Sequence, residues 1–386
     1  MSQVTSELSI TITRTIKDIP EGEWDRLFGN EIIEGYGYHK TMEESNLKEF
    51  SFYYLLASRN NSLVAIIPFF TNEFSLATTI QGTFRKLMLL LQRLLPRILQ
   101  PKILFIGCPT CEQIYLGISR QENPKYILDK ALPELYKFSE KEKISAIIFY
   151  NFTSKHETII RYLSKKRFSR MECFPNTVIT VNAGSVEEYI HSLGKSTRKS
   201  IRRKLRDSRS IVELTTEAVE DITGLENKIF ELYLNNLNDS EVSFEFLTRE
   251  FFNNICDNMK GLVKFFITRD KNTIVAFNLV LIKNRTMIDK FVGFDKKISH
   301  KYHLYHTTLC HNIDYCIRNG LKYYQMGVTD YEPKIRLGCQ IMPLYVSVKF
   351  LNPALNLFTG ALVKLLEPKK FDPGLKKIKT SLHQPQ

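Results

Sequence analysis

The stretch YQMGVTDYEPKIRLGCQIMPLYVSVKF (Tyr324–Phe350) has strand-forming residues at both ends and charged residues in its middle. The runs LKYYQMG and MPLYVSVKF, which frame it, have the β-branched and aromatic content typical of strands. The segment between them holds two acids, two bases and a phenol: Asp330, Tyr331, Glu332, Lys334 and Arg336. Functional sites are often built on loops that strands hold in place. An ordinary solvated hairpin has the same pattern, so both interpretations stay open.

Composition indicates a folded protein with anionic partners. The chain has 386 residues, enough for two domains, of which 43% are hydrophobic and 25% charged. Its formal net charge is +13. A basic balance of this kind favours nucleic acid, phosphorylated cofactors or an anionic membrane surface as partners.

The cysteines and the N-terminus predict a reducing compartment. Seven cysteines are scattered along the chain, and Cys108 and Cys111 form one CxxC in GCPTC, with no second pair at the distance of a zinc ribbon. A turn with small apolar side chains accounts for CPTC, so we predict no metal site. The start, MSQVTSELSITITRT, has no basic-then-apolar signal. We therefore expect no secretion and a cytoplasmic location.

The segment FRKLMLLLQRLLPRILQPKILFIG (Phe84–Gly107) combines leucines at helical spacing with positive charge only. Such a helix is typical of a segment that lies in a membrane interface. A helical hairpin packed on the protein's own core is the alternative, and Pro96 favours two short helices over one. No apolar run is long enough to cross a bilayer. The basic leucine-rich insertion near residues 84–102 thus predicts peripheral binding to the inner face of a membrane.

Strand and helix patterns alternate and predict an α/β protein. Strand-like runs in the first half are SITITR, FYYLLAS, SLVAIIPFF, ISAIIFY and TVITVN. The second half has helices, sheet meanders and one crossover helix. This order is typical of a twisted mixed sheet flanked by helices in each half. We expect domains at residues 1–183 and 184–352, followed by an apolar helix and a basic tail at 353–386.

The run KSTRKSIRRKLRDSR (Lys195–Arg209) has eight basic residues and one acid. Arg198, Arg202 and Arg206 share one helical face at i, i+4 spacing. Such a stripe suits the phosphates of a carrier, a lipid or tRNA, and it has no aromatic residue for stacking on single-stranded nucleic acid. An exposed helix with solvated side chains is the alternative, but the one-sided charge favours an anionic partner.

Four histidines fall in SHKYHLYHTTLCH (Ser299–His311). An i, i+3 pair on a helix can chelate a metal, but no carboxylate at a familiar spacing accompanies them. His306 as a general base near a pocket is the better interpretation, because imidazole titrates near neutral pH. The chain has no GxxxxGK[ST], no GxGxxG after a strand and no GxSxG. Nucleotide hydrolysis, dehydrogenase and α/β-hydrolase chemistry are therefore poorly supported.

Several strings together resemble the FemAB-like branch of the GNAT acyltransferase superfamily. They are YIHSLGKSTRKSIRRKLRDS, FLTREFF, DKFVGF and IDYCIRNGLKYYQMGVTDYEPKIRLGCQIMPLYVSV. The resemblance spans most of the chain. It is closest from Tyr189 to Val348 and looser in the first half, at GYHKTMEESN, FIGCPT and KKRFSRMECFPNTVITV. It implies two GNAT-like domains in tandem, the second with the better-preserved site.

The resemblance also implies site residues by position. Glu332 and Lys334 fall on the acid and lysine of the family's terminal motif, and Lys290 stands for an arginine in the strand before Gly293. The basic-helix motif is matched by Arg198, Lys199, Ile201 and Arg202. The departures are Pro333 for a histidine, an inserted Tyr331, Arg336 one place early, and His306 where an acid is common.

The phosphate-binding turn departs from the GNAT pattern as well. Ordinary GNAT enzymes hold the acyl-CoA pyrophosphate with a Gly-rich turn at a helix N-terminus. Here the turn reads FDKKISHKYH, with no glycine after Phe294. Lys296 and Lys297 would have to substitute for the backbone donors, so CoA is not assured as the donor.

The resemblance implies transfer of an acyl group to an amine. Glu332 or Asp330 would take the proton of the amine, Lys334 would stabilise the oxyanion or a donor phosphate, and Tyr331 would protonate the leaving group. We expect an N-acyltransferase that uses an acyl thioester, acyl-CoA or a carrier, as co-substrate and an amine acceptor, such as a lipid at the cytoplasmic membrane face. No permanently bound cofactor and no DNA partner are expected.

Two alternatives remain at this stage. The first is an aminoacyl-tRNA-dependent transferase that acts on a peptidoglycan precursor, as the best-known FemAB enzymes do. Those enzymes often carry a coiled-coil arm, which this sequence does not show. The second is an inactive module that binds an anionic lipid or saccharide.

Overall fold

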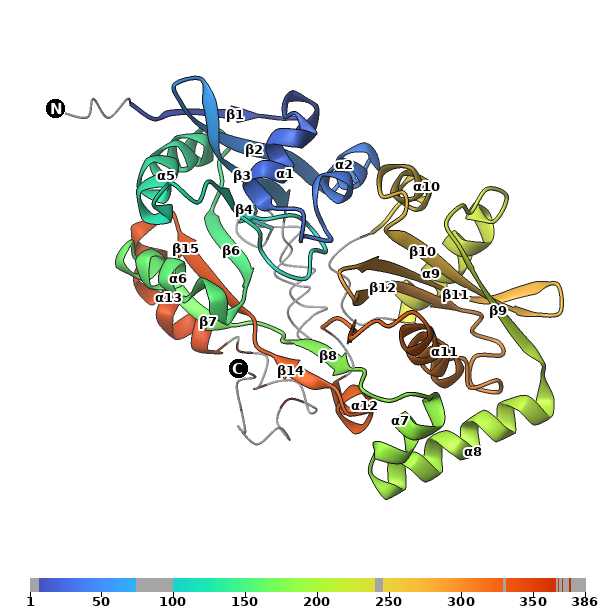
Figure 1. Ribbon diagram of the computed structural model, residues 1–386. Helices are drawn as coiled ribbons and strands as arrows, with labels where there is room; N and C mark the ends of the chain where they lie inside the picture. Colours follow the sequence, from blue (N-terminus) through green and yellow to red (C-terminus); the bar gives the residue numbers. More distant parts are fainter. Residues whose placement is uncertain are drawn as a thin grey trace. The chain divides into compact units, whose positions relative to one another are not determined.

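The computed structural model describes residues 7–73, 100–239, 246–328 and 331–365, together with residues 367, 370 and 375. These residues form two compact units, each built around one sheet (Figure 1). Unit 1 comprises residues 1–173, 242–247 and 344–367, and unit 2 comprises residues 174–241, 248–343 and 368–386. The predicted α/β class, with a mixed sheet and flanking helices in each half, is confirmed.

The sheet of unit 1 has the order β1-β2-β3-β4-β6-β15-β7, and the short strand β5 also pairs with β3. Its described pairs are antiparallel except β4 with β6, which is parallel. The strands are β1 Ser9–Thr13, β2 Phe50–Arg59, β3 Ser62–Glu73, β4 Lys102–Ile106, β5 Gly117–Ile118, β6 Ala146–Phe152, β7 Ser169–Glu172 and β15 Tyr345–Phe350. The helices are η1 Ile16–Asp18, α1 Glu21–Phe28, α2 Tyr36–Glu44, α5 Pro124–Lys141, η3 Ser154–His156, α6 Glu157–Lys165 and α13 Pro353–Leu365.

Helix α5 is the crossover between the parallel strands β4 and β6. It begins at Asn123, whose side chain accepts a hydrogen bond from the Lys125 amide, and Pro124 occupies the first helical position. Its apolar residues recur at helical spacing and pack into the core of unit 1. The buried ones are Ile127, Leu128, Ala131, Leu132 and Leu135.

The sheet of unit 2 has the order β14-β8-β13-β12-β11-β10-β9. Its described pairs are also antiparallel except one, β12 with β13, which the helix α11 connects. The strands are β8 Asn176–Thr180, β9 Leu214–Val219, β10 Val263–Asp270, β11 Thr273–Lys283, β12 Thr286–Phe294, β13 Tyr323–Gln325 and β14 Gln340–Met342. The helices are α7 Val186–Ser192, α8 Lys195–Ile211, α9 Glu226–Asp239, α10 Arg249–Asn258, α11 Leu304–Arg318 and α12 Tyr331–Arg336.

The predicted domain boundary after residue 183 assigns β8 to the first domain and β15 to the second. The structure places each strand in the sheet of the other unit. Strand β8 pairs with β13 and β14 of unit 2, and β15 pairs with β6 and β7 of unit 1. Residues 344–352 therefore belong to unit 1 rather than to the second domain. Local strand patterns carry no information about distant partners, so the sequence alone placed both strands in the wrong half.

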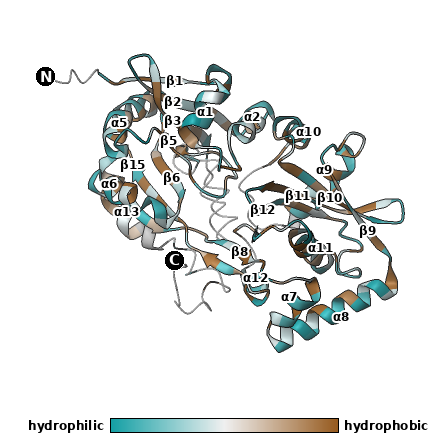
Figure 2. Ribbon diagram, in the orientation of Figure 1, coloured by the Kyte–Doolittle hydropathy of each residue, from teal (hydrophilic) through white to brown (hydrophobic). Residues whose placement is uncertain are grey.

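The charged segment after β13 is partly helical, where the sequence analysis expected a loop. Tyr331–Arg336 form the short helix α12. Glu332 and Arg336 pair at i, i+4 across its turn, and Pro333 is tolerated within a first turn. Figure 2 shows that the long basic helix α8 is largely hydrophilic, as predicted.

Most of the predicted membrane insertion, residues 84–99, lies outside the described residues, and Lys102 is the first residue of β4. None of the described helices is both long enough and apolar enough to span a membrane. All seven cysteines are free thiols.

Gly293 marks a close approach between β12 and α9. A Cβ atom at this position would lie 2.4 Å from the Phe277 ring and 2.6 Å from the backbone carbonyl carbon of Leu232. We predict that Gly293→Ala lowers the free energy of unfolding by about 1–3 kcal/mol, because a methyl group is forced into a packed contact. Urea denaturation measures the change.

Gly194→Ser is the matched control in the same unit. Gly194 caps α8 with ordinary extended backbone, and a Cβ atom there would have no other atom within 4 Å. Serine is also a good N-cap residue. Equal stability of Gly293→Ala and Gly194→Ser would contradict the close approach.

Candidate functional site

The sheet of unit 2 opens between its two parallel strands. β12 and β13 pair over three residues, from Thr286 with Tyr323 to Ile288 with Gln325. The next residue of the second strand, Met326, continues the pairing with β8 on the other side, where its amide donates to the Thr177 carbonyl at 2.8 Å. Meanwhile β12 continues along β11 as far as Phe294. The split lies where the parallel strands part, and such positions in α/β sheets are places where ligands bind.

A β-bulge sits on β12 at the start of the split. Val280 of β11 pairs with Asp289 and Leu279 pairs with Phe291, so Lys290 is the extra residue between them. Bulges turn side chains locally and are common next to active sites. Beyond the bulge, Asn236 of α9 donates to the Val292 carbonyl at 2.8 Å. A helix side chain therefore supplies a partner along the part of β12 that β13 does not reach.

Four polar side chains form a network at the mouth of the split. The Asp289 carboxylate accepts hydrogen bonds from Asn278 Nδ2 at 2.5 Å and from the Tyr324 hydroxyl at 2.7 Å. Asn312 of α11 donates to the Asn278 side-chain oxygen at 2.6 Å and to the Tyr324 hydroxyl at 2.8 Å. Asn278, Asn312 and Tyr324 are fully buried, and Asp289 is half-buried. Side chains from the two neighbouring strands thus fix one carboxylate of β12, and a helix side chain supports both of them.

Burial and the adjacent Asp289 carboxylate hold the pKa of Tyr324 well above its usual range. The phenol therefore stays protonated and remains a donor to Asp289 at any physiological pH. Asn312 Oδ1 is buried and has no hydrogen-bond partner among the described residues. Partly completed polar networks of this kind are uncommon in pure cores and occur at functional sites.

Helix α12 holds the chain that leaves β13. Lys334 is buried, and its ammonium donates to the Met326 carbonyl at 2.5 Å and to the Gly327 carbonyl at 3.4 Å. The Tyr331 hydroxyl, also buried, lies 2.5 Å from the Val328 carbonyl and 2.9 Å from the Pro175 carbonyl. Both side chains therefore bind backbone of residues 326–328 and keep this segment apart from β12.

The other charged residues of this motif lie differently. Glu332 is partly exposed and forms an ion pair with Arg336 at 2.6 Å on the surface of α12. Asp330 lies outside the described residues. The structure thus brings Tyr331 and Lys334 to one stretch of backbone and leaves Glu332 paired on the same helix.

His306 lies on the first turn of α11 and contacts the basic helix. The Lys204 ammonium donates to His306 Nε2 at 2.9 Å. Burial first, and then the charges of Lys204 and His303, lower the pKa of His306 to about 4. Burial and Arg203 lower the pKa of Lys204. The imidazole is therefore neutral at physiological pH, with its acceptor nitrogen already occupied.

The basic helix α8 divides its charges between internal contacts and solvent. Arg198 donates to the His191 carbonyl at 2.7 Å and so caps the C-terminal end of α7, and Arg202 pairs with Glu187. The side chain of Arg206 is 77% exposed. Other basic residues of the helix that point to solvent are Lys195, Lys199, Arg203 and Arg209.

The turn between β12 and α11 does not resemble a phosphate cradle. Lys296 and Lys297 are exposed. At the helix N-terminus the Leu304 amide already donates to Ser299, and the His306 amide donates to His303. His303 caps the helix in left-handed backbone without a side-chain bond. Two of the amides that would bind a pyrophosphate in an ordinary helix N-terminus are therefore in use.

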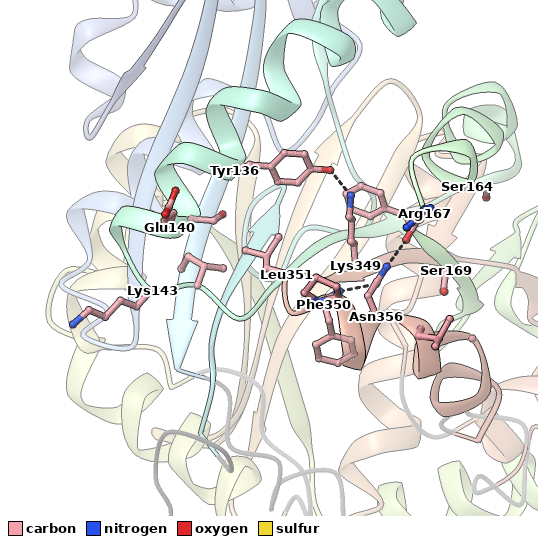
Figure 3. Close-up of a pocket in the computed structure, with 16 residues that line it drawn as sticks. Tyr136, Glu140, Lys143, Ser164, Arg167, Ser169, Lys349, Phe350, Leu351 and Asn356 are labelled. Atoms are coloured by element: carbon pink, nitrogen blue, oxygen red, sulfur yellow. Dashed lines mark hydrogen bonds between the residues drawn. The ribbon is translucent and has the colours of Figure 1, made fainter.

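Unit 1 contains a cavity of about 1080 Å³, shown in Figure 3. It lies between α5, α6 and α13 and holds Lys349, whose ammonium donates to the Tyr136 hydroxyl at 2.8 Å and to the Lys166 carbonyl at 3.0 Å. None of the residues predicted to form the site lines this cavity. The polar network of unit 2 is therefore the better candidate.

Sequence reasoning missed Asp289, Asn278, Asn312 and Tyr324 as a group. The available signal was Asn278 in the apolar strand VAFNLVLI and Asp289 within the mainly apolar strand TMIDKFVGF. Polar residues at positions that alternation places inside a sheet are seldom tolerated without a partner. The partners lie on separate elements, so the signal identified individual residues but not their convergence.

Comparison with known proteins places this geometry in a family. The model of FemAB-like proteins, described as peptidoglycan biosynthesis/recognition, matches residues 15–358. The chain belongs to the FemAB-like family. The resemblance found in the sequence is thereby confirmed. No functionally curated protein matches this FemAB-like chain.

Solved structures show the same fold at low sequence identity. FemX has a TM-score of 0.55 and 11% identity, over 89% of this chain and 98% of FemX. A tandem GNAT protein from the clavulanic acid biosynthesis pathway has a TM-score of 0.55 and 8% identity, over 90% and 99% of the two chains. L-PGS from Bacillus licheniformis has a TM-score of 0.50 and 10% identity, over 85% and 91%. The tandem GNAT-like fold is therefore confirmed.

Lys334→Met tests whether α12 holds the chain after β13. The substitution keeps the length of the side chain and removes the donor to Met326 and Gly327. We predict a loss of about 1–3 kcal/mol of unfolding free energy, because buried carbonyls lose a charged donor. We also predict faster hydrogen exchange at residues 326–328. The control is Lys260→Met, which removes an exposed lysine from the same unit; equal exchange in both variants would contradict the role of Lys334.

His306 predicts a pH dependence of stability. Its pKa of about 4 in the folded protein lies below the value near 6.5 of an unfolded chain. Between these values the unfolded state binds more protons, so the folded state loses stability as the pH falls. His306→Gln, whose amide oxygen can still accept from Lys204, should reduce this slope in denaturation curves at pH 4 to 6.5. The control His300→Gln removes an exposed imidazole, and an unchanged slope in His306→Gln would refute the prediction.

Proposed function

We propose that this FemAB-like chain transfers an aminoacyl group from an ester on RNA to a primary amine of a cell-envelope precursor. The observation that carries the proposal is the Asp289 carboxylate, fixed by Asn278 and Tyr324 at the split between β12 and β13. Family membership supports an acyl or aminoacyl transfer. The split supplies an edge of β12 along which an extended acceptor can lie.

The transfer needs one base that takes the proton of the amine and polar groups that hold this base in place. The amine nitrogen attacks the ester carbonyl carbon, the bond from that carbon to the ribose oxygen breaks, and an amide forms. The amine gives up a proton and the departing ribose oxygen takes one, so the transfer is balanced without a further reactant. Asp289 accepts the amine proton directly or through one water. Asn278 and Tyr324 keep the carboxylate in one orientation, which lowers the cost of reaching the transition state.

In this proposal the buried residues of α12 hold the backbone near the site and take no part in proton transfer. Lys334 and Tyr331 hold the carbonyls of residues 326–328, so the split stays open beside Asp289. Glu332, which lies partly exposed beside Arg336, is the carboxylate of this motif that can contact the acceptor or the donor. Lys290 is the extra residue of the bulge and follows Asp289 directly in β12.

Two features favour an RNA ester over a CoA thioester as the donor. The amides of Leu304 and His306 at the N-terminus of α11 already have backbone acceptors. The basic face of α8, by contrast, exposes Lys199, Arg203 and Arg206, which suits an extended phosphate backbone.

The decisive assay supplies the purified protein with labelled bulk aminoacyl-tRNA, and separately with an acyl-CoA mixture. Each reaction contains a nucleotide- or lipid-linked muropeptide or an amine-bearing lipid as acceptor. We expect a ribonuclease-sensitive product with the muropeptide, identified by mass spectrometry. Transfer from acyl-CoA that ribonuclease leaves untouched would refute the RNA donor and restore the thioester interpretation.

Asp289→Asn tests the site itself. We predict that it lowers kcat by on the order of 10² to 10⁴, the range expected when a general base is lost, while the protein remains folded by circular dichroism. Tyr324→Phe should lower kcat less, because it removes only one donor to the carboxylate. Asp314→Asn is the matched control, since Asp314 forms a surface pair with Arg318 on α11. Unchanged turnover in Asp289→Asn would rule out this site.

Charge reversal on α8 tests the donor. Lys199→Glu with Arg203→Glu should raise KM for aminoacyl-tRNA by about tenfold or more at low salt and flatten its salt dependence, because released counterions set the slope. Reversal at both Lys264 and Arg269, which pair with Glu220 and Glu217 on the sheet, is the control with the same change in net charge. Equal effects of the two reversals would contradict a specific contact with α8.

A further inference from the structure

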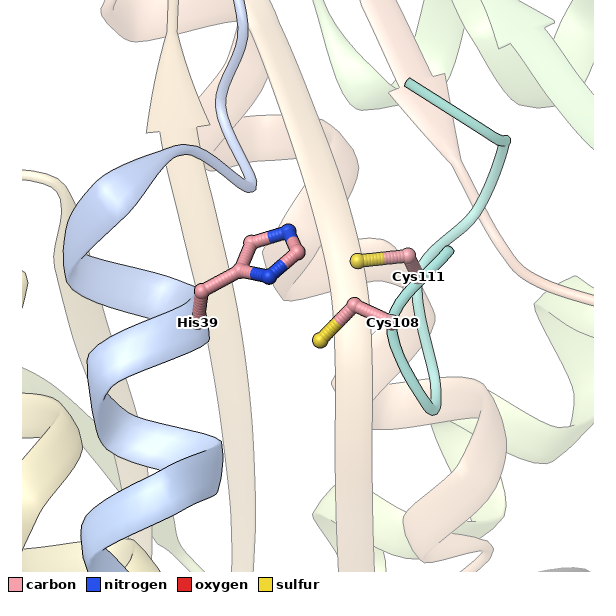
Figure 4. Close-up of side chains that lie close together, drawn as sticks. All are labelled: His39, Cys108 and Cys111. Atoms are coloured by element: carbon pink, nitrogen blue, oxygen red, sulfur yellow. The ribbon is translucent and has the colours of Figure 1, made fainter. Parts of the chain in front are cut away.

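Three buried side chains of unit 1 converge from two distant parts of the sequence. His39 comes from α2, and Cys108 and Cys111 come from the turn that follows β4 (Figure 4). Their potential ligand atoms all lie within 4.8 Å of one another. The residues are 4%, 3% and 4% exposed, in that order.

The donor set is one that zinc prefers. Two thiolates and an imidazole are borderline-soft ligands, and a Cys₂His set is known for zinc with a fourth position left for another ligand. In a tetrahedral site the sulfur atoms lie about 3.8 Å apart, given zinc–sulfur bonds of about 2.3 Å. The ligand atoms, which lie within 4.8 Å of one another, therefore need to approach by only about 1 Å to bind one zinc ion.

The turn that carries the cysteines is held in a defined shape. Gly107 has a φ of +127°, and a Cβ there would lie 2.9 Å from the Tyr150 ring, so this position requires glycine. The Cys111 amide donates to the Cys108 carbonyl at 3.3 Å, and Asn151 Nδ2 donates to the Cys111 carbonyl at 2.9 Å. The Sγ atoms are thus presented from one tight turn.

Neighbouring residues fix the two sides of the cluster to each other. The Tyr38 hydroxyl, next to His39 on α2, is hydrogen-bonded to Thr110 Oγ1 between the two cysteines. The carboxylate of Glu34, which is buried, accepts the amide of Glu112 at 2.9 Å. The His39 ring packs on Trp24 with centroids 4.7 Å apart. These contacts fix the positions from which the three side chains extend.

Two simpler explanations account for less of this arrangement. Buried free cysteines often serve as small apolar side chains, but that role does not account for a buried imidazole beside them. A disulfide would use the two cysteines and leave His39 unexplained, and the two cysteines are not disulfide-bonded in the structure.

We propose that His39, Cys108 and Cys111 bind one zinc ion, with water or another oxygen donor in the fourth position. Binding deprotonates both thiols and releases their protons to solvent. The ion joins α2 to the turn after β4, just past the carboxyl end of the parallel strand pair of unit 1. The corresponding place in unit 2, after β12, holds the turn that leads into α11.

Metal content of the purified full chain tests the proposal. Cells are grown with zinc, and the protein is dialysed under reducing conditions against a weak chelator. We expect elemental mass spectrometry to find one zinc ion per chain. Cys108→Ser, Cys111→Ser and His39→Gln should each lose the bound equivalent. Cys173→Ser, a free thiol of the same unit outside the cluster, should keep it.

Cobalt substitution of the wild-type protein gives a second readout that needs no variant to fold. Bound Co²⁺ should show thiolate-to-metal charge transfer and the visible bands of a tetrahedral site, and zinc should displace it. Zinc retained by the Cys108→Ser, Cys111→Ser double variant would overturn the assignment. So would a wild-type chain that takes up neither metal, or one in which thiol alkylation and intact mass reveal a Cys108–Cys111 disulfide.

Discussion

The short pairing of β12 with β13 is the constraint on which the candidate site depends. Three parallel residue pairs hold the strands together, and beyond them the chain of β13 continues along β8, its neighbour on the other side, without pairing with β12. Continued pairing would cover the backbone edge of β12 beyond Ile288. Lys334 and Tyr331 prevent this because they bind the carbonyls of residues 326–328. A buried ammonium is costly, and here it is retained where it determines backbone geometry.

The two units use one topology for different chemistry. Among the described strands, each sheet has a single parallel pair, joined by a crossover helix, α5 in unit 1 and α11 in unit 2. Around Asp289 of β12 the polar groups are a carboxylate, two amides and a phenol. After β4 they are two thiols and, from α2, an imidazole. Carboxylate and amide groups suit proton transfer and orientation of a substrate, whereas thiolates and imidazole suit a borderline-soft metal.

Helix α8 shows why the number of basic residues in a run does not by itself indicate that the run binds an anionic ligand. Arg198 caps α7, Arg202 pairs with Glu187, and Lys204 donates to His306. These three cations serve the protein's own structure. The remaining exposed face is still strongly positive, and the helix can therefore both pack on unit 2 and attract phosphates.

The sequence by itself determined the α/β class, the mixed sheets, the helical nature of the basic run and the family, because periodicity and local motifs are properties of neighbouring residues. It did not determine which sheet β8 and β15 join, since strand pairing depends on distant partners. It singled out Lys334 and Tyr331 but predicted catalytic roles for them. Their bonds to backbone carbonyls appear only in three dimensions. Only the tertiary structure revealed the polar network of Asp289 and the cluster of His39 with the two cysteines of CPTC. The members of each group lie on separate elements, which only packing brings together.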